Sequence, residues 1–142
     1  MRACAESLVA KLGTQGPILV YTDYESRVIK GLVQRFPDLS SPLNAVLERI
    51  VDLAPPVKES YYHPDMMGSW SLKAVLPTIA PDLDYTALEG VHEGTEASAA
   101  YIEAIGPDTT PQRKEELRQQ LLKYCKYDTL AMVRLVAFFS AR

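Results

Sequence analysis

The fold is decided by the stretch Pro17-Ile18-Leu19-Val20-Tyr21, which runs directly into Thr22-Asp23-Tyr24-Glu25. The first part is a short, continuous apolar run, which is typical of a strand buried on both faces of a parallel sheet. The second part can open a helix that Pro37 ends. A further helix leads to a second short apolar run, so we predict strands near 18–21 and 50–53. Because a strand, helices and then a strand imply a parallel crossover, the predicted class is α/β, helix-rich, with a short parallel sheet.

The rest of the chain is predicted to be mainly helical, with Gly and Pro residues near the ends of the helices. The segment from Ala54 to Pro81 is dense in Pro, Tyr and Met and is predicted to hold loops and short helix fragments. Val28 and Tyr101 are assigned to inward helix faces by their spacing. The predicted helices, apart from the two beside the strands, cover residues 3–12, 71–76 (stopped by Pro77), 94–105 and 111–139.

Length and composition are those of one globular domain. The 142 residues are 47% apolar and 23% charged, and no apolar run approaches the ~20 residues of a membrane span. Residues 1–12 lack the apolar core of a signal peptide, so we expect a cytoplasmic protein with Cys4 and Cys125 as reduced thiols. The net charge of −3 argues against unspecific coating of nucleic acid but permits a local basic strip.

A carboxylate interrupts the apolar face of the predicted helix 111–139. Asp128 falls on this face, one turn after Tyr124. A carboxylate that faces a core costs several kcal/mol unless it is hydrogen-bonded, paired or bound to a metal. Two interpretations follow: a carboxylate held by a buried hydrogen bond, or a ligand with a chemical role. The apolar positions that define the face are Leu117, Leu121, Tyr124, Ala131, Met132, Leu135, Phe138 and Phe139.

Glu25 is a second candidate for chemistry, because it follows the first strand at the edge where open parallel sheets place their ligands. The competing interpretation is a capping box, in which Thr22 and Glu25 satisfy the first amides of the helix. Asp52 ends the second strand, where it can bind a metal or cap the turn that follows. Carboxylates gathered from separate elements are what a two-metal phosphoryl-transfer site needs, because Mg²⁺ takes oxygen ligands.

Two of these patterns resemble a known superfamily. Thr22-x-Tyr24-Glu25 is similar to the second motif of the DEDD exonucleases, an Asn-x-Phe-Asp pattern, with Thr for Asn and Glu for Asp. Tyr124-x-x-x-Asp128 is similar to the third motif of their tyrosine branch. The resemblance is closer still to an uncharacterised bacterial family of that superfamily, the domain of unknown function 2779. Its pattern resembles Tyr62-His63-Pro64, Gly68 to Pro77 and Tyr124 to Met132, and so covers nearly the whole chain.

The resemblance implies a ribonuclease-H-like fold and metal-dependent removal of nucleotides from a 3' end. Glu25 and Asp128 would then bind Mg²⁺ or Mn²⁺, two ions in the complete domain, and Tyr124 would orient the attacking water. Such exonucleases take two more carboxylates from an Asp-x-Glu on their first strand, and none precedes Glu25. We therefore expect residues 1–142 to be a partial ribonuclease-H-like domain that lacks its N-terminal strands and is inactive by itself. The alternative is a catalytically dead module that binds nucleic acid or protein.

Nucleic acid is the partner that the resemblance implies. The candidates for binding it are Trp70, Ser71 and Lys73. Trp70 can stack on a base or fill the core, and Lys73 can meet a phosphate or be solvated.

Two expectations concern the histidines. His63 beside Asp65 can ligate a metal, although a histidine in a Pro-bounded loop is more often structural, and His92 is expected to be exposed.

A missing first strand would leave one edge of the strand at 18–21 open. Open edges recruit partners, so we expect either a homodimer through this edge or coverage by the helix at 3–12.

Overall fold

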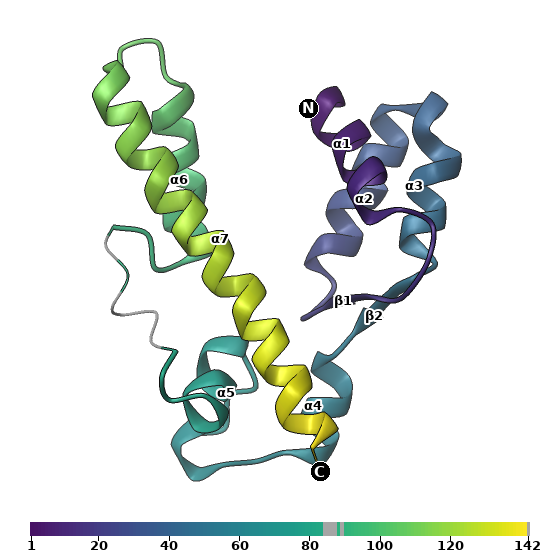
Figure 1. Cartoon of the computed structure of the whole chain (residues 1–142), viewed down its shortest axis with the longest axis vertical. Helices are drawn as coiled ribbons and strands as arrows, with labels where there is room; N and C mark the ends of the chain where they lie inside the picture. The colour runs from purple at the N-terminus through teal and green to yellow at the C-terminus, as the bar shows by residue number, and fades with distance from the viewer. Residues whose placement is uncertain (84–87, 89, 142) are drawn as a thin grey trace. The chain divides into compact units, whose positions relative to one another are not determined.

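The computed structural model describes residues 1–83, 88 and 90–141, and Figure 1 shows it. The chain divides into two compact units, Met1–Tyr62 and His63–Arg142. Each unit contains an apolar cluster made only of its own residues. No described helix is both long enough and apolar enough to cross a membrane.

The first unit combines helices with a small sheet. Strands β1 and β2 pair in parallel, with Ile18 opposite Ile50 and Val20 opposite Asp52. This pairing confirms the predicted crossover, the positions of both strands, and the α/β class of a helix-rich chain with a short parallel sheet. In order, the elements are α1 (Arg2–Leu12), β1 (Ile18–Val20), α2 (Tyr24–Arg35), the 3-10 turn η1 (Pro37–Leu39), α3 (Ser40–Leu47), β2 (Ile50–Asp52) and α4 (Ala54–Ser60).

The core of this unit lies among α1, α2 and α3, and Ile18 and Ile50 pack against it from one face of the sheet. On the other face Leu19 and Val51 remain 38% and 44% exposed. The prediction of a strand buried on both faces is therefore wrong, because side chains alternate along a strand and Leu19 points away from the core. Val28, assigned to the inward face of α2, is likewise 47% exposed. The buried residues of the core are Ala5, Ile29, Leu32, Leu43 and Val46.

Arg49, just before β2, holds the loop between α1 and β1. Its Nε donates to the carbonyl of Gly16 at 2.8 Å, and Nη1 donates to that of Gly13 at 2.6 Å. Nη2 donates to the carbonyls of Leu12 and Gln15 at 2.9 and 2.7 Å. A guanidinium carries five N–H donors in a fixed fork, so one side chain orders a loop that has little apolar surface to bury.

The second unit is built around one long helix. Figure 1 shows α6 running alongside the first half of α7 and α5 beside its second half, in agreement with the helix contacts. The predicted helix at 111–139 is confirmed, and the Thr110 hydroxyl caps it by accepting from the Arg113 amide at 3.3 Å. The elements are the 3-10 turn η2 (Pro64–Met66), α5 (Leu72–Ile79), α6 (Gly94–Ile105) and α7 (Pro111–Ser140).

Two helices of the structure contain proline. Pro55 and Pro56 lie in the first turn of α4, a short helix within the segment predicted to hold loops and helix fragments, and there the missing amide protons have no intrahelical role. Pro77 does not stop α5, which continues to Ile79. Buried packing of the preceding residues outweighs the single amide that Pro77 lacks, and the Ala80 amide still donates to the Leu76 carbonyl at 2.8 Å.

Two other expectations concern single side chains. Tyr101 is 58% exposed on α6, so its assignment to the inward face is wrong. The three alanines Ala97, Ala100 and Ala104 fill that face instead, since small side chains allow a close approach to α7. Cys4 and Cys125 are free and exposed.

Candidate functional site

The central pair of the candidate site is Tyr124 and Asp128 on α7. Both side chains are half-buried, and they are joined by a side-chain hydrogen bond in which the phenol donates to the carboxylate. Tyr124 packs against both apolar clusters of the second unit. Asp128 therefore lies on the apolar face of α7 that packs inward, the inward stripe, as its spacing predicts. A hydrogen bond to Tyr124 holds its side chain there.

Burial and charge act together on the Tyr124 phenol. Burial is the largest cause that raises the pKa of Tyr124 to about 12, followed by the negative charge of Asp128 and the hydrogen bond to it. A buried phenolate next to a carboxylate is unfavourable on both counts. At neutral pH Tyr124 is consequently a hydrogen-bond donor, not a base.

Substituting Asp128→Asn is expected to lower the pKa of Tyr124 from about 12 part of the way towards its ordinary value of ~10. The fall is partial because burial, the largest cause, remains. The raised pKa also means that Tyr124 contributes fully to stability below pH ~10, and that this contribution is lost as pH rises towards 12. NMR titration with ¹³C-labelled tyrosine measures the change among the eight tyrosines. Asp108→Asn in the exposed loop before α7 is the matched control, and an unchanged Tyr124 titration in Asp128→Asn would contradict the pairing.

Glu25 lies exposed in the first turn of α2. The capping-box interpretation fails, because the N-cap is Asp23 and no side chain forms a capping hydrogen bond there. Thr22 instead lies in the left-handed region with φ 77°. Its amide donates to Asp52 Oδ1 at 2.8 Å. The turn that presents Glu25 is thus fixed from the end of the neighbouring strand.

Asp52 has a structural role at this turn. Its Oδ1 also accepts from the Ala54 amide at 2.9 Å, so one oxygen closes the turn after β2 and fixes the turn after β1. Burial raises the pKa of Tyr21, and the negative charge of Asp52 raises it further. These contacts favour the capping interpretation of Asp52 over metal ligation.

The three candidates for substrate binding lie at the start of α5. Ser71 is the N-cap, and its hydroxyl accepts from the Ala74 amide at 3.3 Å. Lys73 donates from Nζ to the His92 carbonyl at 2.7 Å and so ties α5 to the segment before α6. Trp70 is half-buried in the turn that leads into the helix. Ser71 and Lys73 therefore have structural roles, and their contact with substrate stays a prediction.

Both histidines make local contacts. His63 Nδ1 accepts from the Asp65 amide at 3.3 Å and caps the turn η2, which supports the structural interpretation. His92 is half-buried, not exposed as predicted: Nε2 lies 2.6 Å from the Leu88 carbonyl and Nδ1 lies 3.4 Å from Glu96. Glu96 in turn accepts from the His92 and Glu93 amides, and these bonds lower its pKa.

Within either unit, the described residues bring no three His, Cys, Asp or Glu side chains together in a group that could hold a metal ion. Glu25 belongs to the first unit, and Tyr124 and Asp128 belong to the second. Each unit offers oxygen ligands of the kind that Mg²⁺ and Mn²⁺ prefer.

Sequence comparison assigns the first half of the chain to a known family. Residues 1–71 match the family described as Domain of unknown function (DUF2779). The chain belongs to this family. In this DUF2779 chain the match contains the whole first unit, with Glu25 and Asp52, and ends at Ser71, so that Tyr124 and Asp128 lie beyond it. Comparison with curated proteins and with solved structures gave no match.

Proposed function

We propose that this DUF2779 chain forms part of a metal-dependent 3'-to-5' exonuclease-like domain that acts on nucleic acid. The observation that carries the proposal is the hydrogen-bonded pair of Tyr124 and Asp128, one turn apart on the inward stripe of α7. A protonated tyrosine beside a half-buried carboxylate suits the third motif of the tyrosine-branch exonucleases that these residues resemble.

The backbone at Thr22 gives independent support. The second motif of those exonucleases has Asn at the position of Thr22, and Thr22 adopts φ 77°. Asn tolerates this left-handed region, whereas a β-branched residue there is a rare outlier. The local conformation therefore suits the resembled motif better than it suits Thr, and it leads directly to Glu25.

Each residue has a definite role in this proposal. Glu25 and Asp128 supply carboxylate oxygens, which are suitable ligands for Mg²⁺ or Mn²⁺. Bound ions would polarise the phosphate and activate water. The one O–H of Tyr124 donates to Asp128, so its phenol oxygen would orient the water by accepting a hydrogen bond from it. The proposal requires the carboxylates of Glu25 and Asp128 to bind Mg²⁺ or Mn²⁺.

Paramagnetic broadening by Mn²⁺ tests this requirement in the 142-residue chain. We expect low concentrations of Mn²⁺ to broaden the amide signals around both Glu25 and Asp128. Glu25→Gln and Asp128→Asn should each reduce the broadening around the substituted residue, because each substitution removes a carboxylate ligand. We expect weak binding and no appreciable cleavage of a labelled oligonucleotide by this chain, since it supplies only two of the four carboxylates used by the exonucleases it resembles.

The control is Glu59→Gln, which removes an exposed carboxylate on α4. Broadening at only one of the two residues, or an equal loss of broadening in the control, would overturn the proposal that both carboxylates bind the metal. The second candidate function, a module that binds another protein, is favoured by the exposed apolar side chains Tyr101, Ile102 and Ile105 on α6, which are 58%, 66% and 63% exposed. An absence of Mn²⁺ binding at Glu25 and Asp128 would favour that module.

A further inference from the structure

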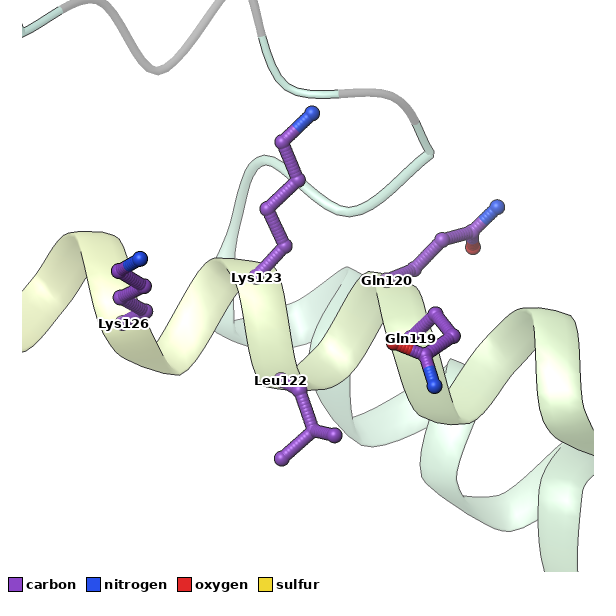
Figure 2. A pocket seen from close by; sticks show the side chains of 5 residues that line it. All are labelled: Gln119, Gln120, Leu122, Lys123 and Lys126. Atoms are coloured by element: carbon purple, nitrogen blue, oxygen red, sulfur yellow. The ribbon is translucent and has the colours of Figure 1, made fainter.

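A groove lies on the part of α7 that precedes Asp128. Its volume is about 420 Å³, within the range of ligand sites. Figure 2 shows five side chains spread around one face of the helix, with Lys123 and Leu122 on opposite flanks. The lining residues are Gln119, Gln120, Leu122, Lys123 and Lys126.

The two lysines differ from the arginines of the same helix. Arg113 pairs with Glu103 and Glu116, Arg118 pairs with Glu115, and Arg134 pairs with Asp82. These ion pairs involve three of the six basic residues of α7.

Lys123 and Lys126 form no ion pair with any described carboxylate. The positions three and four residues away from each of them on α7 hold no Asp or Glu, and these are the positions that face each other on a helix. Both lysines are exposed. The groove therefore keeps two positive charges in a protein whose net charge is −3.

The other lining groups add more than charge. Gln119 donates from Nε2 to Glu115 at 2.6 Å, which fixes its amide and leaves its carbonyl oxygen as an acceptor. Gln120 lies so close to Gly90 that a Cβ there would be 2.5 Å from its amide group. Leu122 is 51% exposed and offers an apolar contact. The two lysines can contact phosphates, and the amides and the apolar side chain can contact bases, so the groove matches a strand of nucleic acid. A free phosphate would need only the lysines.

We propose that this groove binds single-stranded nucleic acid, with Lys123 and Lys126 contacting successive phosphates. The inference rests on the proposed function for its choice of ligand, and it assigns the binding to a face of α7 different from the stripe that carries Tyr124 and Asp128. Residues three apart on a helix have Cβ atoms ~5–6 Å apart, so both ammonium groups can reach one strand. Contacts with phosphates and an apolar contact with Leu122 read no base edge, so such binding would tolerate different sequences.

Fluorescence anisotropy with a labelled oligothymidylate tests the proposal on the 142-residue chain. Lys123→Glu/Lys126→Glu should weaken binding by about 10-fold or more, and it should reduce the slope of log K against log salt by about 1.4, from two contacts at ~0.7 each. The control Lys11→Glu/Lys30→Glu makes the same change in net charge at exposed positions of α1 and α2 and should change binding by less than about 2-fold. Equal losses in the two double variants, or no binding by the unaltered chain, would overturn the proposal.

Two further arms complete the test. Inorganic phosphate should compete poorly, and polyphosphate should bind more weakly than the oligonucleotide; equal binding of polyphosphate would show a plain polyanion site and overturn the proposal. Mn²⁺ broadening that fails while the oligonucleotide still binds would reject the exonuclease proposal alone, and the reverse result would reject the groove alone. Substitutions at these exposed lysines are expected to change stability by less than ~0.5 kcal/mol, and Lys→Gln variants replace any that fold poorly.

Discussion

Replacing Arg49 by Ala is expected to lower the free energy of unfolding of the first unit by roughly 2–4 kcal/mol. The guanidinium donates four hydrogen bonds to carbonyls between Leu12 and Gly16. Hydrogen bonds from a charged donor contribute ~1.5–3 kcal/mol each when they are shielded. The freed carbonyls near the surface can be hydrated, so the expected total is well below the sum.

Two variants separate the fork from the charge at Arg49. Arg49→Lys keeps the charge but has three donors on one nitrogen, so it should recover less than half of the loss. Arg35→Ala removes an exposed arginine from the last turn of α2 and should change stability by ~0.5 kcal/mol or less. Hydrogen exchange of peptides from residues 12–20 and 49–53 reports on this unit directly. Equal stability of Arg49→Ala and Arg35→Ala would contradict the role of the fork.

The sequence predicts the parallel pairing of β1 and β2 because that pairing depends on local apolar runs and on the handedness of crossovers. It does not predict which face of β1 is covered. Leu19 and Val20 are equally apolar, yet Val20 is 5% exposed and Leu19 is 38% exposed. That difference depends on the direction from which α1, α2 and α3 pack, and this is a tertiary property.

In the candidate site too, the sequence predicts the features that depend on local spacing and does not predict the long-range contacts. The inward place of Asp128 follows from helical periodicity, and its bond to Tyr124 follows from their spacing of one turn. The contacts of Asp52 with Thr22 and of Arg49 with the loop before β1 are between side chains and backbone groups some thirty or more residues away in sequence. Such bonds depend on the path of the backbone, so no sequence pattern predicts them. A charged residue between Leu47 and Ile50 was the only local sign of the Arg49 contact.

Leu76→Ala is expected to lower the stability of the second unit by about 2–5 kcal/mol. Leu76 is fully buried and packs with Ala80, Leu83, Leu88 and Ala131. Truncation removes apolar contacts and leaves a cavity that the surrounding side chains fill only in part. Urea denaturation measures the loss through the shift of the midpoint.

Hydrogen exchange shows where the loss acts. Helix α5 has only eight residues and contains Pro77, and isolated helices of this length are marginal in water. Its amides should therefore exchange faster in Leu76→Ala before those of α6 do, because α6 packs on the first half of α7 through a separate cluster. The control Val133→Ala truncates a side chain that is 58% exposed on α7 and should leave exchange in α5 unchanged. If Leu76→Ala speeds exchange equally in α5 and α6, then the two clusters unfold as one cooperative body, and α5 does not depend on its own cluster alone.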